Sequence, residues 1–190
     1  MIRLCSTSQT RAKLLQKFNV DFTQSKIDFN EDSIKTSDAK SFVYNVVKGK
    51  LDNALKLYTL DMPILVADTV VNSSSGQILR KAKSVDEAKE LLLAQSGKNI
   101  SIISAAILKS KKLEFIDISS TIYCFKEFNS SDLQEYLDSN EWQGKAGACM
   151  VEGFCKKYIK SVKGLESTAM GLQVEKIMPW LEFWCFMIKS

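Results

Sequence analysis

The sequence predicts an α/β protein in which a mixed, twisted β-sheet is flanked by helices. Amphipathic helical patterns alternate with apolar runs rich in β-branched residues, without the regular strand-helix-strand repeat of a purely parallel sheet. Hydrophobic residues make up 45% of the 190 residues, which is enough apolar mass for one core. No segment is repetitive or low in complexity. We therefore expect a single domain over residues 1–190.

Six segments are predicted to be strands because they are short, apolar and rich in β-branched residues. Two pairs of them are expected to form hairpins. Ser73–Gly76 supplies the turn of the first, and the lysine-rich segment 109–112 that of the second. In chain order the strands are 2–5, 64–71, a return strand ending near 81, 100–108, 113–125 and 158–162.

Five segments have the apolar period of a helix. Ser8 is a typical N-cap for the first, and Ser84 with Glu87 three residues later forms a capping box before the third. Pro179 predicts a break in the last helix, because proline removes a helical hydrogen bond. In chain order the helices are 8–18, 38–58, 84–95, 131–139 and 172 onward.

Histidine is absent, and this excludes several classes of site. Ser-His-Asp triads, Cys-His proteases and histidine-ligated zinc all require it. Carboxylates, lysines, hydroxyls or a metal must therefore carry any chemistry. The five cysteines show no CxxC spacing, and their odd number favours a reducing, cytoplasmic setting.

Composition also restricts the partners of the chain. We find no apolar stretch of signal-peptide type at the N-terminus and none long enough to span a bilayer, so we expect a soluble protein without a membrane partner. The net charge of +4 is mild and the lysines are scattered, so no stable nucleic-acid binding is expected. The apolar segment 178–188 is expected to close the core. A homodimer contact is the alternative, because tryptophan and phenylalanine often anchor interfaces.

Asp68 and a cluster of hydroxyls are the first chemical signals. Asp68 lies in the apolar strand 64–71, where a buried charge needs a partner. Such a carboxylate either serves a ligand at the end of the strand or caps the following turn. Ser6, Ser8 and Arg11 stand at a strand-to-helix turn, whose free N–H groups can receive a phosphate. The alternative is an ordinary helix cap beside a solvated arginine.

Further charged residues gain meaning only in combination. Taken singly, Glu31, Lys50 and Lys81 are typical of solvated surfaces. With Asp68 and Arg11 they supply two carboxylates able to hold a divalent cation and several cations able to meet a polyphosphate. That set suffices to cleave a phosphate ester or anhydride without histidine.

Seven short segments follow one another in the order and spacing of known family motifs. They are Ser6–Arg11, Phe42–Lys50, Ala67–Val71, Leu79–Ala82, Gln95–Gly97, Lys145–Ala148 and Gly171–Leu172. With them the chain resembles, nearly end to end, the Maf family of nucleoside triphosphate pyrophosphatases, which is related in fold to the inosine triphosphate pyrophosphatases. The departures from the family pattern are Gln9, Ala82 and Gln173 in place of prolines and Ile100 in place of a histidine.

The resemblance implies a fold like that of the inosine triphosphate pyrophosphatases, with a central nucleotide-binding cleft. It implies hydrolysis of the α-β phosphoanhydride of a nucleoside triphosphate substrate, in nucleotide-pool cleaning, and a role in arrest of cell division. It further implies a divalent cofactor, Mg²⁺, Mn²⁺ or Co²⁺, held by Asp68 and Glu31. The implied catalytic residues are Asp68 as proton acceptor, Glu31, Lys50, Lys81 and Arg11, and the implied substrate-binding residues are Ser6, Ser8, Thr69, Lys145 and Glu152.

The preferred base and two other function classes stay open. The pair Asp68-Thr69 resembles the branch for thymidine and uridine triphosphates, whereas Glu152 resembles the branch for methylated guanosine triphosphates. A carboxylate accepts hydrogen bonds from guanine N–H groups but donates none to a uracil carbonyl, so Glu152 favours a purine if it reaches the base. The alternatives to an enzyme are a non-catalytic nucleotide-binding regulator of septum formation and a nucleic-acid-binding module. The retained charged set disfavours the first and the scattered charge disfavours the second.

Overall fold

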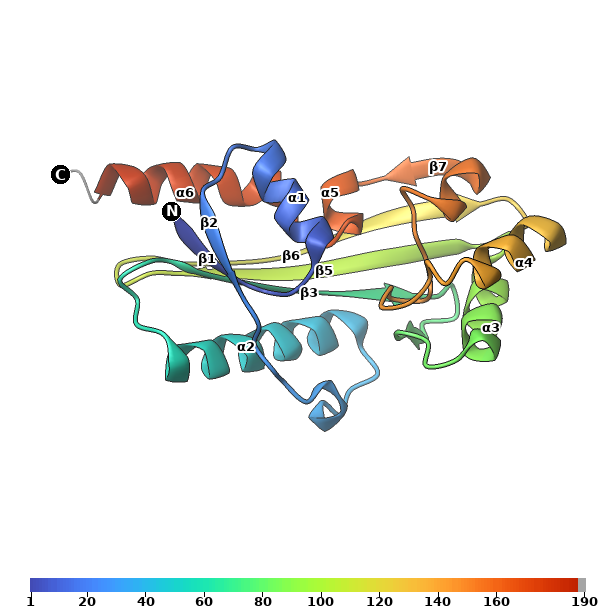
Figure 1. The fold of residues 1–190 in the computed structure, drawn as a ribbon, viewed down its shortest axis with the longest axis horizontal. Coiled ribbons are helices and arrows are strands. Elements are labelled where there is room, and N and C mark those ends of the chain that lie inside the picture. The colour runs from blue at the N-terminus through green and yellow to red at the C-terminus, as the bar shows by residue number, and fades with distance from the viewer. Residues whose placement is uncertain (188–190) are drawn as a thin grey trace.

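The computed structural model describes residues 1–187 and shows one mixed sheet with helices on both faces (Figure 1). The strands are β1 (Ile2–Cys5), β2 (Phe22–Ser25), β3 (Ile64–Asn72), β4 (Ile78–Leu79), β5 (Asn99–Lys109), β6 (Glu114–Phe125) and β7 (Ile159–Lys163). The helices are α1 (Gln9–Lys17), α2 (Ala39–Leu57), α3 (Val85–Gln95), α4 (Ser130–Asp138), α5 (Glu166–Ala169) and α6 (Val174–Met187), with 3-10 turns η1 (Glu31–Ser33) and η2 (Phe154–Tyr158). The predicted α/β class is confirmed.

The strand order leaves one stretch of β3 without a neighbouring strand on one of its two edges. The sheet runs β2-β1-β3-β5-β6-β7, with β1 parallel to β2 and β3 and the other pairs antiparallel. One edge of β3 pairs with β5 over its whole length. On the opposite edge, β1 pairs with Ile64 and Leu65, and β4 with Val71 and Asn72. Among residues 1–187, the intervening segment 66–70 therefore has no strand partner on that edge.

Helices cover both faces of the sheet (Figure 1). Val66 and Val70 of β3 pack in the core beneath α2, whereas Leu65 and Ala67 pack with α1 and α6 on the other face. Successive side chains of a strand point to opposite faces, so a strand covered on both sides is apolar throughout. This explains the continuous apolar run in which Asp68 stands out.

The predicted elements are confirmed within a few residues, with additions and one correction. The edge strand β2 and the short helix α5 were not predicted, because Phe22–Ser25 and Glu166–Ala169 are short and mostly polar. The predicted break near Pro179 is wrong, because α6 continues across it. Proline removes one hydrogen bond, and the burial of Val174, Ile177 and Leu181 in the core holds the helix nonetheless.

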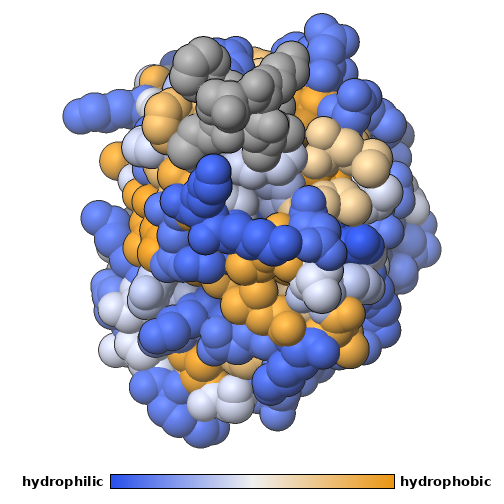
Figure 2. All heavy atoms as spheres, turned by 90° about the vertical axis from the view of Figure 1, so that its left-hand side faces the viewer, coloured by the Kyte–Doolittle hydropathy of each residue, from blue (hydrophilic) through white to orange (hydrophobic). Residues whose placement is uncertain are grey.

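Within the C-terminal segment, Met178 and Leu181 pack against the core on the face of α1, whereas Phe183 is exposed. Leu181 is buried, and Trp180 stacks on Phe115 with ring centroids 5.1 Å apart. Ile188 and the side chains of residues 185–187 lie outside the described structure, and the homodimer contact stays a prediction. At this end of the molecule, apolar side chains are exposed in patches that hydrophilic side chains separate (Figure 2). Within residues 1–187, no helix is long and apolar enough to cross a membrane.

Candidate active site

A cleft of about 600 Å³ opens beside segment 66–70 of β3, at the edge that has no strand partner. The turn after β1, the segment before η1, the middle of α2 and the loop after α4 enclose it. All ten residues assigned from the sequence line it: Ser6, Ser8, Arg11, Glu31, Lys50, Asp68, Thr69, Lys81, Lys145 and Glu152. The structure thus brings the whole predicted set together, and the gap between β1 and β4 explains why: the edge of β3 is open to a ligand there.

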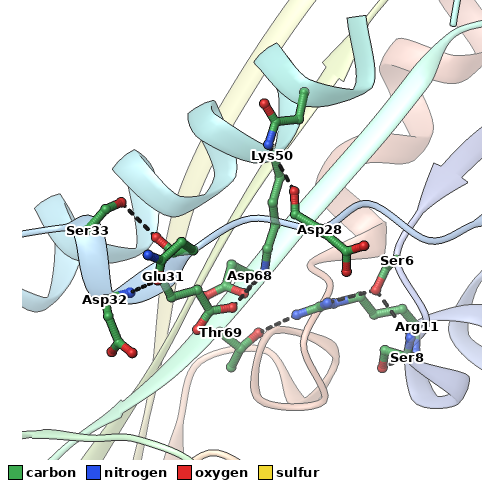
Figure 3. A network of polar contacts seen from close by, with 12 residues as sticks. Ser6, Ser8, Arg11, Asp28, Glu31, Asp32, Ser33, Lys50, Asp68 and Thr69 are labelled. Atoms are coloured by element: carbon green, nitrogen blue, oxygen red, sulfur yellow. Dashed lines mark hydrogen bonds and ion pairs between the residues drawn. The ribbon is translucent and has the colours of Figure 1, made fainter. Parts of the chain in front are cut away.

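Asp68 points toward α2 and is paired there with Lys50 (Figure 3). Lys50 Nζ donates to Asp68 Oδ1 at 2.6 Å and to Glu31 Oε1 at 3.0 Å. The side chain of Asp68 is only 8% exposed, so the ammonium group supplies the partner that its charge requires. Asp68 thus belongs to a charged cluster in the cleft, as the ligand-site interpretation expects.

Gly49 allows Glu31 to approach Lys50. A Cβ atom at Gly49 would lie 2.1 Å from the ring of Phe29. The absence of that atom lets the chain before η1 pack directly on α2. Glu31, at the start of η1, is thereby brought to the lysine that follows Gly49.

The environment of Glu31 favours its charged form. Burial opposes ionisation, but the charge and hydrogen bond of Lys50, with Lys81 and Arg80 nearby, outweigh it and lower the pKa of Glu31. A carboxyl whose pKa is lower in the folded state stabilises the fold at pH values above its unfolded pKa. That stabilisation is lost as the pH falls through the folded pKa.

We expect the free energy of unfolding to decrease as the pH falls below about 4.3, the ordinary pKa of glutamate, and to decrease less in Glu31→Gln. Urea unfolding followed across this acidic range measures both slopes. Asp28→Asn is the control, because the Asp28 side chain is 82% exposed. Equal slopes for wild type and Glu31→Gln would contradict the role of Glu31.

Arg11 reaches into the cleft from the first turn of α1. Its Nε donates to Gly171 O at 2.8 Å, Nη1 to Ser6 Oγ at 2.9 Å and Nη2 to Thr69 Oγ1 at 3.1 Å. Burial lowers the pKa of Arg11 despite the nearby charges of Asp68 and Glu31, but a guanidinium stays protonated in proteins. Its hydrogen bonds within residues 1–187 go to neutral oxygens. The charge of Arg11 is therefore available to an anion.

Thr69 positions Arg11 rather than leaving its hydroxyl free. Thr69 Oγ1 lies 2.7 Å from Ser104 Oγ, which donates to Thr168 O at 2.7 Å. Because the proton of Ser104 is used there, Thr69 donates to Ser104 and accepts from Arg11. Ser104 was not predicted as a site residue. A hydroxyl in the apolar strand 100–108 requires a polar partner, and this requirement could have indicated it.

The turn between β1 and α1 is held in place by β2. Ser8 caps α1 by accepting from the backbone N–H of Arg11 at 3.4 Å, and Ser8 N donates to Ser6 Oγ at 3.2 Å. Gln24 of β2 donates to Ser6 O at 2.7 Å. The N–H groups of a first helical turn lack intrahelical partners, and Gln9 and Thr10 both line the cleft. The turn therefore offers an anion both backbone donors and a positive helix end.

The loop that carries Lys145 is fixed to the segment that carries Lys81. Gly147 N donates to Arg80 O at 2.9 Å, and Ala146 forms a β-bridge with Lys81. The fully buried Gln95 of α3 donates from Nε2 to Gly147 O at 2.7 Å. Gln95 is a positioning residue that the sequence did not reveal.

We expect Gln95→Leu to lower the free energy of unfolding by about 1 kcal/mol, because it leaves the Gly147 carbonyl unpaired. Gln95 Oε1 is itself buried without a partner in the described chain, and removing it offsets part of the loss. Urea unfolding measures this change. The exposed Gln134→Leu is the control, and an unchanged stability of Gln95→Leu would contradict the anchor.

The two carboxylates fit a divalent cation whose coordination is completed by other ligands. Among the side chains that the structure describes, those of residues 1–184, no group of three or more His, Cys, Asp or Glu could hold a metal ion. However, oxygens of Glu31 and Asp68 already converge on one cation, the Lys50 ammonium. Mg²⁺ commonly takes one or two protein carboxylates together with phosphate oxygens and waters.

The fold and the cleft together define an α/β protein whose site joins paired carboxylates to the N-terminal turn of a helix. A family model described as Maf-like protein matches residues 1–183. The chain therefore belongs to the Maf family, and the resemblance seen in its motifs is confirmed.

Curated relatives cover nearly the whole chain. A nucleoside triphosphate pyrophosphatase of a Nitratiruptor species is 52% identical over 179 residues, which span 93% of this chain and 96% of that protein. A protein of the same name from Helicobacter pylori is 41% identical, with 92% of each chain covered. Another from Campylobacter jejuni is 34% identical, with 95% of this chain and all of that protein covered.

Proposed function

We propose that this chain hydrolyses the bond between the α and β phosphates of a nucleoside triphosphate, releasing a monophosphate and pyrophosphate. Relatives that carry the name nucleoside triphosphate pyrophosphatase support this proposal at 52% and 41% identity. One observation carries it. Asp68 and Thr69, neighbours on the open edge of β3, face opposite sides of the sheet, and the Asp68 carboxylate and the Arg11 guanidinium that binds Thr69 line the same cleft.

Asp68 is the proposed proton acceptor. Its Oδ1 is bonded to Lys50, whereas Oδ2 has no hydrogen-bond partner among the side chains described, residues 1–184, and is open to a proton from the attacking water. Arg11 and Lys81 stabilise charge on the departing pyrophosphate together with Lys50. Ser6, Ser8 and the helix turn hold phosphate oxygens.

A divalent cation, Mg²⁺, Mn²⁺ or Co²⁺, is the proposed cofactor. Glu31 and Asp68 would hold it, with substrate oxygens and water as further ligands. When bound, it neutralises phosphate charge and lowers the pKa of a bound water. The protein then needs to take only one proton and to hold the leaving group.

The proposed base is a purine, including methylated guanine, read by Glu152. Glu152 and Lys145 line the cleft on the loop after α4. Both side chains of the pair Asp68-Thr69, which resembles the thymidine and uridine branch, are engaged within the protein: Asp68 by Lys50, and Thr69 by Arg11 and Ser104. This supports Glu152 as the group that discriminates bases.

A turnover panel tests the proposal. Purified protein with each of the three metals is given common and methylated nucleoside triphosphates, and products are separated by chromatography. We expect monophosphate and pyrophosphate, fastest with a guanosine derivative, and no turnover after chelation until metal is returned. Release of inorganic phosphate as the first product would contradict the proposed bond, and preference for dTTP or UTP would contradict the role of Glu152.

A role in arrest of cell division, which the resemblance implies, stays a prediction. The non-catalytic regulator is the corresponding alternative. The folded protein would have to bind nucleotides without turning over any of them, whatever the metal. That outcome of the same panel would favour the regulator.

A further inference from the structure

Two cysteines lie side by side on the Glu152 side of the cleft. Cys149 Sγ and Cys155 Sγ are 3.3 Å apart, within hydrogen-bond distance for two thiols. Cys149 lines the cleft, whereas Cys155 is completely buried in the core. The proposed hydrolysis uses neither of them, so the pair is a feature of the site without an assigned role.

The loop between the two cysteines is folded back so that they meet. The backbone N–H groups of Gly153 and Cys155 both donate to Met150 O at 3.1 Å. The side chain of Met150 packs over Gly153, where a Cβ atom would lie 2.8 Å from its sulfur. A disulfide bond is about 2.0 Å long, so the two sulfur atoms need to approach by roughly 1.3 Å. Movement within one short loop can supply that.

We propose that Cys149 and Cys155 form a reversible disulfide when a two-electron oxidant, such as a peroxide, enters the cleft. The Cys149 sulfur attacks a peroxide oxygen and becomes a sulfenic acid, and the O–O bond breaks with release of water. The Cys155 sulfur then attacks the Cys149 sulfur, the S–O bond breaks and a second water leaves. The two electrons lost by the thiols reduce the peroxide, and an added dithiol later supplies two electrons that return the disulfide to two thiols.

The surroundings of the two cysteines determine how fast they are oxidised. The hydrogen bond with Cys155, followed by burial and the charge of nearby groups, raises the pKa of Cys149. The thiolate is the reactive form, so oxidation is slow at neutral pH and responds to sustained rather than brief exposure.

Formation of the disulfide should alter substrate binding in the cleft. Glu152 lies between the two cysteines, inside the ring that the bond creates. This step rests on the proposed function: a nucleotide seated in the cleft covers Cys149 and slows the oxidation, and the closed ring restrains Glu152 and raises the KM of the substrate. Disulfide formation itself does not depend on hydrolysis.

Peptide mapping tests the proposal on the folded full chain. The azo oxidant diamide accepts two electrons and two protons and spares Met150. After diamide and iodoacetamide, trypsin cleaves behind Lys145 and Lys156 and releases both cysteines in one peptide, 146–156. We expect this peptide unalkylated and lighter by two hydrogen atoms than its reduced form, and reversal by dithiothreitol. Cys155→Ala must lose the product, whereas the matched control Cys124→Ala must keep it.

Three outcomes would overturn the proposal: two alkylated cysteines in peptide 146–156 after diamide, a peptide linking Cys149 to any other cysteine, or a disulfide dimer on a non-reducing gel. A separate arm adds a nucleoside triphosphate, which should slow the closure roughly tenfold at saturation. Equal rates with and without nucleotide would overturn its placement over Cys149 while the disulfide stands. The mass of peptide 146–156 therefore tests the disulfide, and the effect of nucleotide on its rate of formation tests the nucleotide site separately.

Discussion

Asp68→Asn is expected to reduce kcat by roughly a thousandfold or more, because removal of a positioned general base has effects of about this size. The fold should persist, since the amide oxygen of asparagine can still accept the hydrogen bond from Lys50. Steady-state kinetics on the nucleotide preferred in the panel measures the loss, and thermal unfolding checks the fold.

The matched control is Asp32→Asn. It makes the same chemical change next to Glu31, on a side chain that is 77% exposed and does not line the cleft. Its kcat should stay within about threefold of wild type. An Asp68→Asn protein with wild-type stability and nearly wild-type turnover would show that another group accepts the proton.

Lys50→Met is expected to lower the free energy of unfolding by about 3 kcal/mol, because it leaves the buried Asp68 carboxylate without its cation. Methionine keeps most of the length of lysine but lacks the ammonium group, both its charge and its hydrogen-bond donors. The substitution also removes a proposed donor to the pyrophosphate, so activity should fall as well. Urea unfolding at neutral pH measures the loss of stability.

The pH dependence gives Lys50→Met a second signature. Without the ammonium, Glu31 loses the charge and the hydrogen bond that lower its pKa in the folded protein. The part of the acid loss that Glu31 contributes should therefore disappear, and stability should decrease less with falling pH than in the wild type. The exposed Lys48→Met on the same helix is the control and should change stability by less than about 0.5 kcal/mol. The same acid loss in Lys50→Met as in wild type would contradict the cluster.

The fold was predictable where local chemistry and tertiary structure agree. The capping residues Ser8 and Ser84 begin α1 and α3, and the long apolar runs form β3, β5 and β6. The strand β2 carried no signal, because its polar side chains lie at the sheet edge and the pairing with β1 is a backbone property. The path of α6 across Pro179 was decided by burial, which outweighs one missing hydrogen bond.

The site was predictable in its charged members but not in the way they are held. Asp68 was predicted because it is a charged residue in an otherwise apolar strand. Its pairing with Lys50 follows from a strand facing a helix, which only the packed fold defines. Gln95 and Ser104 act through partners distant in sequence, Gly147 and Thr168, so no local spacing identified them.

Hydrolysis in heavy-oxygen water shows which phosphorus atom the water attacks. We expect attack at the α phosphorus, so the heavy oxygen appears in the nucleoside monophosphate and the released pyrophosphate carries none. Asp68→Asn, run beside the wild type, should yield neither product above background. Heavy oxygen in pyrophosphate or in inorganic phosphate would place the attack on another phosphorus and contradict the proposed chemistry of this cleft.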